Sequence, residues 1–194
     1  MIQEEQSAYF KLLGVLLYNE PSLTSVNKLI NDAPFTELPY AAENEAVLKG
    51  LELMVNWLKS SNAEGLTDVA RSDYMRLFVG PGKLLAPPWG SVYLDKDRLI
   101  FDENTLVVRQ FYERFGMKLK EKYKEPDDHI GLELEFLAYL AEQGEEEAMV
   151  SFAKNFMLPW ILRWNSDIQK NARTDYYKGL ANMAIGGVQE LCGL

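Results

Sequence analysis

The sequence is poor in the residues that build metal centres and disulfides. Its 194 residues include one cysteine, Cys192, and one histidine, His129. A lone cysteine excludes an internal disulfide and a cysteine-cluster metal site, and it suits a reducing cytoplasm. Because a zinc site needs three or four such ligands, we expect neither a resident metal nor a cofactor.

Long apolar runs and an excess of positive charge are also missing. No stretch approaches 18 uncharged apolar residues, and the N-terminus begins with Glu4 and Glu5 rather than with basic residues. These features argue against a membrane-spanning helix and against a secretory signal. The net charge of −9 argues against binding to nucleic acid.

The acidic excess lies in one place. Residues 125–147 contain nine acidic and no basic residues, which leaves 20 acidic residues to balance 20 basic ones elsewhere. This stretch is either a solvated surface that aids solubility or a face that attracts a positively charged partner.

Sequence signatures of catalysis are absent as well. The segment "FVGPGKLL" fails as a phosphate loop, because Leu77 and Leu84 occupy the places of the required glycine and hydroxyl residue. His129 follows Asp128 directly, and neighbours on a helix point about 100° apart, so they form a poor catalytic pair. Ser91 lies outside any nucleophile-elbow motif. For His129 a structural role, a contact with a ligand and catalysis as a base all stay open.

Helical periodicity dominates the chain. In "NEAVLKGLELMVNWLKSS" the apolar residues recur every three or four positions, with charged residues between them. Similar patterns predict helices over residues 4–18, 22–31, 44–61, 66–78, 104–115, 126–143, 145–157, 159–171 and 175–191. We therefore expect an all-α fold, a single-domain bundle of about eight or nine helices over residues 1–194. Pro126 is expected in the first turn of its helix, with Asp127 and Asp128 beside it at the positive end of the dipole.

One long non-helical insert, residues 79–101, interrupts this pattern. It contains "APPWGSVYLDKDRLIF", in which adjacent prolines block helix and the last part is at most a hairpin fragment. The insert is too aromatic for disorder, so we expect an ordered loop. Trp89 either plugs the bundle or is held out by the stiff prolines for a ligand; the second interpretation is the working hypothesis.

Apolar rings and a few polar groups gather at the junctions of this insert, which is the usual makeup of a ligand pocket. The candidate binding residues are Leu77, Phe78, Pro88, Trp89, Ser91, Tyr93, Asp127, Asp128 and His129. No catalytic residue is assigned among them.

Four blocks of the sequence resemble the DmsD branch of the TorD/DmsD family of redox-enzyme maturation chaperones. They are "RLFVGPG…APPWGSVYLD" at 76–95, "TLVVRQFY" at 105–112, "EPDDHIG" at 125–131 and "LPWILRW" at 158–164. The blocks occur in the family's order and spacing, and the likeness covers essentially the whole chain.

The resemblance implies an all-α cytoplasmic protein that is not an enzyme. Such a chaperone would bind the twin-arginine signal peptide on the precursor of a molybdenum-cofactor oxidoreductase, such as the catalytic subunit of a dimethyl sulfoxide reductase. It would hold that precursor back from export until its cofactor is loaded. By resemblance, the peptide site would involve Leu77 and Phe78, then Pro88, Trp89 and Ser91, then Asp128 and His129. Carboxylates there would pair with guanidinium groups, and the rings would hold the apolar segment.

Two alternatives stay open. One is a nitrate-reductase-type assembly chaperone whose client lacks an exported signal, and the other is a nucleotide hydrolase that uses Asp128 and His129. A monomer is the default expectation, with a helix-exchanged dimer as the alternative.

Overall fold

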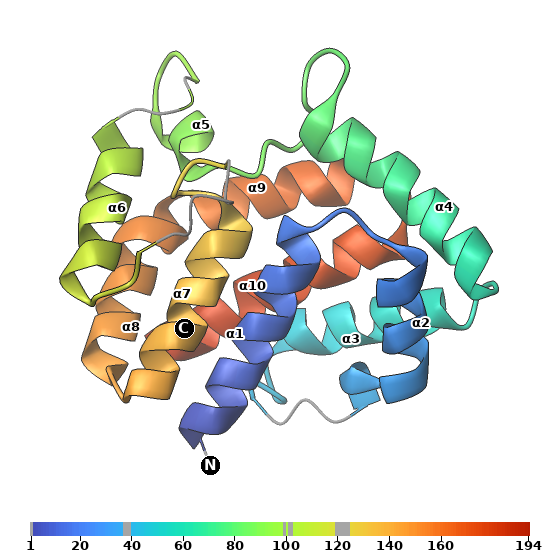
Figure 1. The fold of residues 1–194 in the computed structure, drawn as a ribbon, viewed down its shortest axis with the longest axis horizontal. Helices are drawn as coiled ribbons and strands as arrows, with labels where there is room; N and C mark the ends of the chain where they lie inside the picture. The colour runs from blue at the N-terminus through green and yellow to red at the C-terminus, as the bar shows by residue number, and fades with distance from the viewer. Residues whose placement is uncertain (1, 37–39, 99, 101–102, 119–124) are drawn as a thin grey trace.

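The computed structural model describes residues 2–36, 40–98, 100, 103–118 and 125–194, and over these ranges the chain is helical (Figure 1). The helices of the N-terminal half are α1 (Ile2–Tyr18), α2 (Leu23–Asp32), η1 (Pro34–Thr36), α3 (Glu45–Leu58), α4 (Ala63–Tyr74), η2 (Met75–Val79) and α5 (Gly90–Leu94). Those of the C-terminal half are α6 (Glu103–Arg114), α7 (Ile130–Gln143), α8 (Glu146–Phe152), η3 (Ala153–Met157), α9 (Leu158–Asn171) and α10 (Asp175–Cys192). The all-α class is confirmed, and within the described ranges pairing of the strand type is limited to one isolated bridge between Trp89 and His129.

The nine helices predicted from periodicity are all present, and most of their ends agree within three residues. Two differences concern the candidate site. Helix α7 begins at Ile130 rather than at Pro126, so the expected place of Pro126, Asp127 and Asp128 in the first turn is wrong. The insert 79–101 contains the short helix α5, so it is not wholly irregular. The rest of the proposed hairpin fragment includes Leu99 and Phe101, which lie outside the described residues.

Two closely packed helix pairs lie at the centre of the bundle: α1 beside α7, and α3 beside α10 (Figure 1). Both pairs cross at glycines. A Cβ built on Gly131 of α7 would lie 2.7 Å from the Cβ of Tyr18 on α1, and one built on Gly50 of α3 would lie 2.7 Å from the carbonyl oxygen of Gly179 on α10. Only glycine allows the backbones to approach this closely. The first crossing places Tyr18 against the start of α7.

Helix ends are fixed by side chains that accept hydrogen bonds from otherwise unpaired backbone N–H groups. Ser22 and Ser25 form a reciprocal capping box on α2, and Asn44 and Asn62 cap α3 and α4. At α8 the helix continues through the π-helical turn η3 into α9, with Pro159 near the start of α9. Pro159 therefore lies in the first turn of α9, where a proline lacks no intrahelical hydrogen bond.

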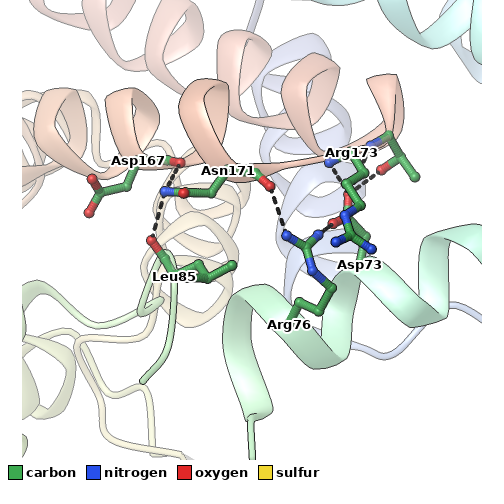
Figure 2. Close-up of polar contacts among 7 residues, drawn as sticks. Asp73, Arg76, Leu85, Asp167, Asn171 and Arg173 are labelled. Carbon is green, nitrogen blue, oxygen red and sulfur yellow. Dashed lines mark hydrogen bonds and ion pairs between the residues drawn. The ribbon is translucent and has the colours of Figure 1, made fainter. Parts of the chain in front are cut away.

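The buried carboxylate of Asp73, at the end of α4, binds the two residues that lead into α10 (Figure 2). Its Oδ2 accepts hydrogen bonds from the backbone N–H of Arg173 at 2.8 Å and from the backbone N–H and the hydroxyl of Thr174, both at 2.9 Å. Its Oδ1 pairs with Nη1 of Arg76 at 2.7 Å. Since Asp73 is 1% exposed, these partners replace its hydration.

The same network reaches the insert that follows η2. Arg76 also donates to the carbonyl of Asn171 at the end of α9, and the Asn171 amide donates to the carbonyl of Leu85 at 3.2 Å (Figure 2). Residue Ala86 then donates its N–H to the carbonyl of Leu77. The insert is thus anchored at its first half before it reaches the candidate site.

Replacing Asp73 tests how much this network contributes to the free energy of unfolding. Asp73→Ala leaves the buried N–H groups of Arg173 and Thr174 without their acceptor and removes the ion-pair partner of Arg76, so we expect the free energy of unfolding to fall by about 2–4 kcal/mol. Asp68→Ala, on the exposed side of the same helix, should change it by less than about 0.5 kcal/mol. Urea denaturation followed by circular dichroism measures both; equal values for the two variants would contradict the assigned role.

Candidate functional site

The insert and the turn before α7 are joined through main-chain hydrogen bonds on both sides of Trp89. The N–H of Ile130 donates to the carbonyl of Pro88 at 2.8 Å, and the N–H of Gly90 donates to the carbonyl of Asp128 at 3.0 Å. These bonds form the bridge between Trp89 and His129. They fix the indole against the imidazole, with ring centroids 6.3 Å apart.

Asp128 ties three segments together through a carboxylate that is almost fully buried. Its Oδ2 accepts from the N–H of Ser91 at 2.6 Å, and its Oδ1 accepts from the hydroxyl of Thr105 at 2.9 Å. Ser91 lies in the first turn of α5, so this carboxylate caps that short helix, and Thr105 belongs to α6. A charge-assisted hydrogen bond of this length is stronger than a neutral one, which accounts for a helix directly after two prolines.

Asp127 is used in the same way on the other side of the turn. Its Oδ2 accepts from Nη2 of Arg109 at 2.6 Å and from Nε of the same residue at 3.0 Å. The hydroxyl of Tyr112 donates to its carbonyl at 2.8 Å. Both carboxylates expected to receive a ligand's guanidinium groups therefore already have internal partners from α5 and α6.

His129 is the N-cap of α7. Its Nδ1 accepts a hydrogen bond from the N–H of Gly131 at 3.0 Å, and its ring lies edge-on to that of Tyr18, with centroids 5.1 Å apart. Burial lowers its pKa from 6.5 to about 3, so the imidazole is neutral at physiological pH. Of the three roles left open for His129, this geometry favours the structural one, and no contact here favours a hydrolase.

The expectation that Trp89 is held away from the protein is wrong. The side chain is 9% exposed, and its Nε1 donates to Oε2 of Glu125 at 3.1 Å. The two prolines restrict the backbone before Trp89. The main-chain hydrogen bonds on either side of Trp89, however, hold its indole ring against His129. The alternative expectation, that the Trp89 side chain packs into the bundle, agrees with its burial.

The other predicted site residues are also buried, and they do not all meet. Pro88, Trp89, Ser91, Asp128 and His129 are brought together at the turn. Leu77 and Phe78 lie in the core, where Phe78 packs edge-on to Tyr74 and Tyr177. Tyr93 faces away toward α9, stacked on Trp160 and donating to Asp167 at 3.2 Å. The expected apolar groove made of Leu77, Phe78, Trp89 and Tyr93 is therefore not a surface of this structure.

A partly exposed surface does lie beside the turn, and sequence reasoning assigned none of its acceptors. We call it the rim, formed by Tyr18, Glu20, Tyr74, Trp89 and Glu125. The hydroxyl of Tyr74 donates to the carbonyl of Tyr18 at 3.3 Å. Burial and the negative charges of Glu125 and Glu20 raise the pKa of the Tyr74 phenol, so both carboxylates lie near it. Glu125 begins the "EPDDHIG" block and could have been found there; Tyr18 and Tyr74 lie outside the distinctive motifs.

Exposed apolar side chains also lie on α1 and on η2, which follows α4. Val15, one turn before Tyr18, is 43% exposed, and Met75 and Val79 are exposed as well. Glu20 is paired with Arg71 at 2.7 Å, whereas Glu125 accepts a hydrogen bond from the indole N–H of Trp89. The rim thus contains the partly exposed carboxylate of Glu125, which accepts a hydrogen bond from the Trp89 indole, and the aromatic side chains of Tyr18 and Tyr74.

Comparison with known proteins agrees with the fold. A crystal structure described as that of a redox enzyme maturation protein from Archaeoglobus fulgidus superimposes with a TM-score of 0.55 at 21% identity, covering 91% of this chain and 88% of that one. Residues 39–166 match the family model described as nitrate reductase delta subunit.

Sequence relatives define the family. The probable Tat proofreading chaperone DmsD of Haemophilus influenzae is 32% identical over 96% of this chain and 90% of its own length. The Tat proofreading chaperone DmsD of Salmonella typhi is 30% identical, covering 90% of this chain and 82% of that protein. The chaperone protein TorD of Shewanella sp. ANA-3 is 24% identical, with 97% and 93% covered. The chain belongs to the TorD/DmsD family of redox-enzyme maturation chaperones.

Two structural searches bear on the other expectations. Among the described residues, no helix combines the length and apolar character needed to cross a bilayer. The same residues contain no group of three or more histidine, cysteine or acidic side chains arranged to hold a metal ion.

The lowered pKa of His129 predicts how stability depends on pH. A base whose pKa is lower in the folded state binds fewer protons when folded, so stability is lost as pH falls from 6.5 toward about 3. The contribution of one such group is at most ~1.4 kcal/mol per pH unit. His129→Asn keeps an N-cap acceptor but does not titrate, so its stability should fall less steeply over this window.

Urea unfolding of the wild type and of His129→Asn at several pH values between about 4 and about 7 gives the two slopes. The carboxylates are common to both proteins and cancel in the difference. Parallel slopes would show that the imidazole is not held neutral by burial.

Proposed function

We propose that this protein is a cytoplasmic chaperone that binds the twin-arginine signal peptide of a redox-enzyme precursor and delays its export. The client is a molybdenum-cofactor oxidoreductase of the dimethyl sulfoxide reductase type, and the chaperone binds it without catalysing a reaction. The names of the relatives support the signal peptide as ligand. The observation on which the proposal mainly rests is the rim, where the Trp89 indole donates to the partly exposed Glu125 carboxylate; exposed apolar side chains lie on α1 and η2.

The ligand's chemistry matches this surface in two parts. Paired arginines require a carboxylate that solvent can reach, which describes the partly exposed Glu125 better than the buried Asp127 or Asp128. A guanidinium can bond a carboxylate with two parallel N–H groups. The apolar segment after the arginines would lie over Val15, Tyr18 and Met75, gaining roughly 25 cal/mol for each Å² removed from water, less the cost of ordering the peptide.

In this proposal the residues predicted from the motifs hold the rim in position. Asp127, Asp128 and His129 fix the turn that presents Glu125, while Pro88, Trp89 and Ser91 fix the facing strand of chain. Leu77, Phe78 and Tyr93 pack the elements on which these segments lie. Their replacement would weaken peptide binding by moving the rim, and Trp89 is itself part of the rim.

Glu125→Gln tests the acceptor directly. Because a hydrogen bond to a charged group is worth about 1.5–3 kcal/mol, the variant should bind a synthetic peptide with two arginines and an apolar segment at least about tenfold more weakly. Glu147→Gln removes the same charge from the exposed start of α8 and should bind like the wild type. Isothermal titration measures both, and no heat from the wild type would defeat the proposal itself.

The match to a family model named after the nitrate reductase delta subunit favours one alternative, an assembly chaperone that recognises its client outside any exported signal. Pull-down of a precursor with and without its twin-arginine segment separates the two. Capture that depends on the segment supports the first function, and unchanged capture supports the second.

A further inference from the structure

A polar hollow lies between α5 and α9, on the side of the insert that carries Tyr93 (Figure 1). Its volume of about 350 Å³ is within the range of pockets that hold small organic molecules. Helix α5 contributes Tyr93, the turn after it contributes Asp95 and Arg98, and α9 contributes Arg163, Ser166 and Asp167. The rim shares none of these residues, so the hollow is a separate candidate site.

The ring of Tyr93 is the packed wall of this hollow. Tyr93 is 7% exposed, and its ring is stacked on that of Trp160 in α9, with centroids 5.7 Å apart. Its hydroxyl donates to Oδ2 of Asp167 at 3.2 Å. Both contacts join α5 to α9, so the hollow is bounded by elements that pack against each other and not by surface side chains alone.

The turn after α5 places the guanidinium group of Arg98 over this ring. The N–H of Asp97 donates to Oδ2 of Asp95 at 2.9 Å, and the N–H of Arg98 donates to the carbonyl of Asp95 at 3.3 Å. Arg98 has a φ of 56°, a left-handed backbone that is uncommon for a residue with a side chain. Its guanidinium carbon lies 5.6 Å from the centre of the Tyr93 ring, which is a cation–π distance.

Arg163 supplies a second guanidinium group from α9. Its Nη2 donates to the carbonyl of Pro159, one turn earlier, at 3.2 Å, and a guanidinium has five N–H donors in all. Within the described parts of the chain, neither Arg98 nor Arg163 forms an ion pair with a carboxylate. Arg76 and Arg109, by contrast, are each paired with one. The two guanidinium groups of the hollow are therefore available to an anion from outside the protein.

The acids of the hollow limit the kind of anion that fits. Two arginines and two aspartates line it, so their charges balance. A ligand with a second negative charge would be repelled by the aspartates, and one with an ammonium group would be repelled by the arginines. Asp95 and Asp167 already accept hydrogen bonds from neutral donors, and a carboxylate can accept several. Hydroxyl groups on the ligand would suit them best.

We propose that the hollow between α5 and α9 is a binding site for a small hydroxy acid that carries one carboxylate. The carboxylate lies between Arg98 and Arg163, whose forked N–H groups match its planar shape. Hydroxyl groups of the ligand donate to Asp95 and Asp167. This site does not depend on the proposed function, because neither its residues nor its test involve the rim or a peptide.

Gluconate tests the site, because its carbon chain carries one carboxylate and several hydroxyl groups. Titration into isotope-labelled protein, followed by NMR, should move the amide signals of residues 92–95 and 163–167 with a dissociation constant of about 1 mM or tighter. Sorbitol has the same chain without the charge and should bind at least about tenfold more weakly. The more highly charged 6-phosphogluconate should also bind more weakly than gluconate.

Three results of this titration would overturn the proposal. The first is the absence of shifts at these residues with gluconate at ~10 mM, well above the expected dissociation constant. The second is equal binding of sorbitol, which would show that the guanidinium groups do not select a carboxylate. The third is tighter binding of 6-phosphogluconate, which would show that the aspartates do not limit the ligand to one charge.

Variants assign the carboxylate to the two arginines. Arg98→Gln and Arg163→Gln change exposed side chains, and each should bind gluconate at least about tenfold more weakly. Lys170→Gln removes the same charge from an exposed position of α9 outside the hollow and should bind like the wild type. The NMR spectrum shows whether each variant is folded. Wild-type affinity in the folded arginine variants, or equal weakening in Lys170→Gln, would also overturn the proposal.

Discussion

The geometry of the site depends on one buried carboxylate, that of Asp128. It bonds the N–H of Ser91 in α5 and the hydroxyl of Thr105 in α6 from the turn before α7, so three segments distant in sequence share one acceptor. Because the charge is almost fully buried, removal of either donor would leave part of its hydration unreplaced. Burial, and then the charge of Asp128, raise the pKa of the Glu133 carboxyl on α7. Asp128 therefore fixes the position of the turn.

This arrangement changes how a motif that includes Asp128 and His129 is interpreted. A sequence block that marks a binding site need not contact the ligand, because a binding surface must be held in place by residues that are themselves saturated. Here the side chains of Asp127, Asp128 and His129 accept hydrogen bonds from groups inside the protein. The donors are Arg109, Ser91 and Gly131, respectively. The half-exposed Glu125, which precedes them, is the residue of the block with a carboxylate at the surface.

Periodicity predicted the helices well, since it depends on local spacing alone. What it could not supply was the partner of each polar group. Nothing near Asp127 in sequence indicates that Arg109 will meet it, and the burial of Glu133 is not visible in a stretch that looks uniformly acidic. Helix α5 escaped prediction because its stability comes from the carboxylate of Asp128, 37 residues away. The start of α7 was misplaced because the helix begins after its N-cap His129, so Pro126 precedes the helix instead of lying in its first turn.

In the folded protein, only part of the acidic stretch 125–147 exposes its charge. Asp127, Asp128 and Glu133 are buried, so its exposed charge lies mainly at Glu142, Glu145, Glu146 and Glu147. These follow the far end of α7, a 14-residue helix about 20 Å long, whereas the turn and the rim lie at its start. At physiological ionic strength charges are screened over about 8 Å. Under the proposed function, the glutamate cluster is therefore too far from the rim to guide arginines onto it, and selectivity for them would come from Glu125 and Glu20 at close range.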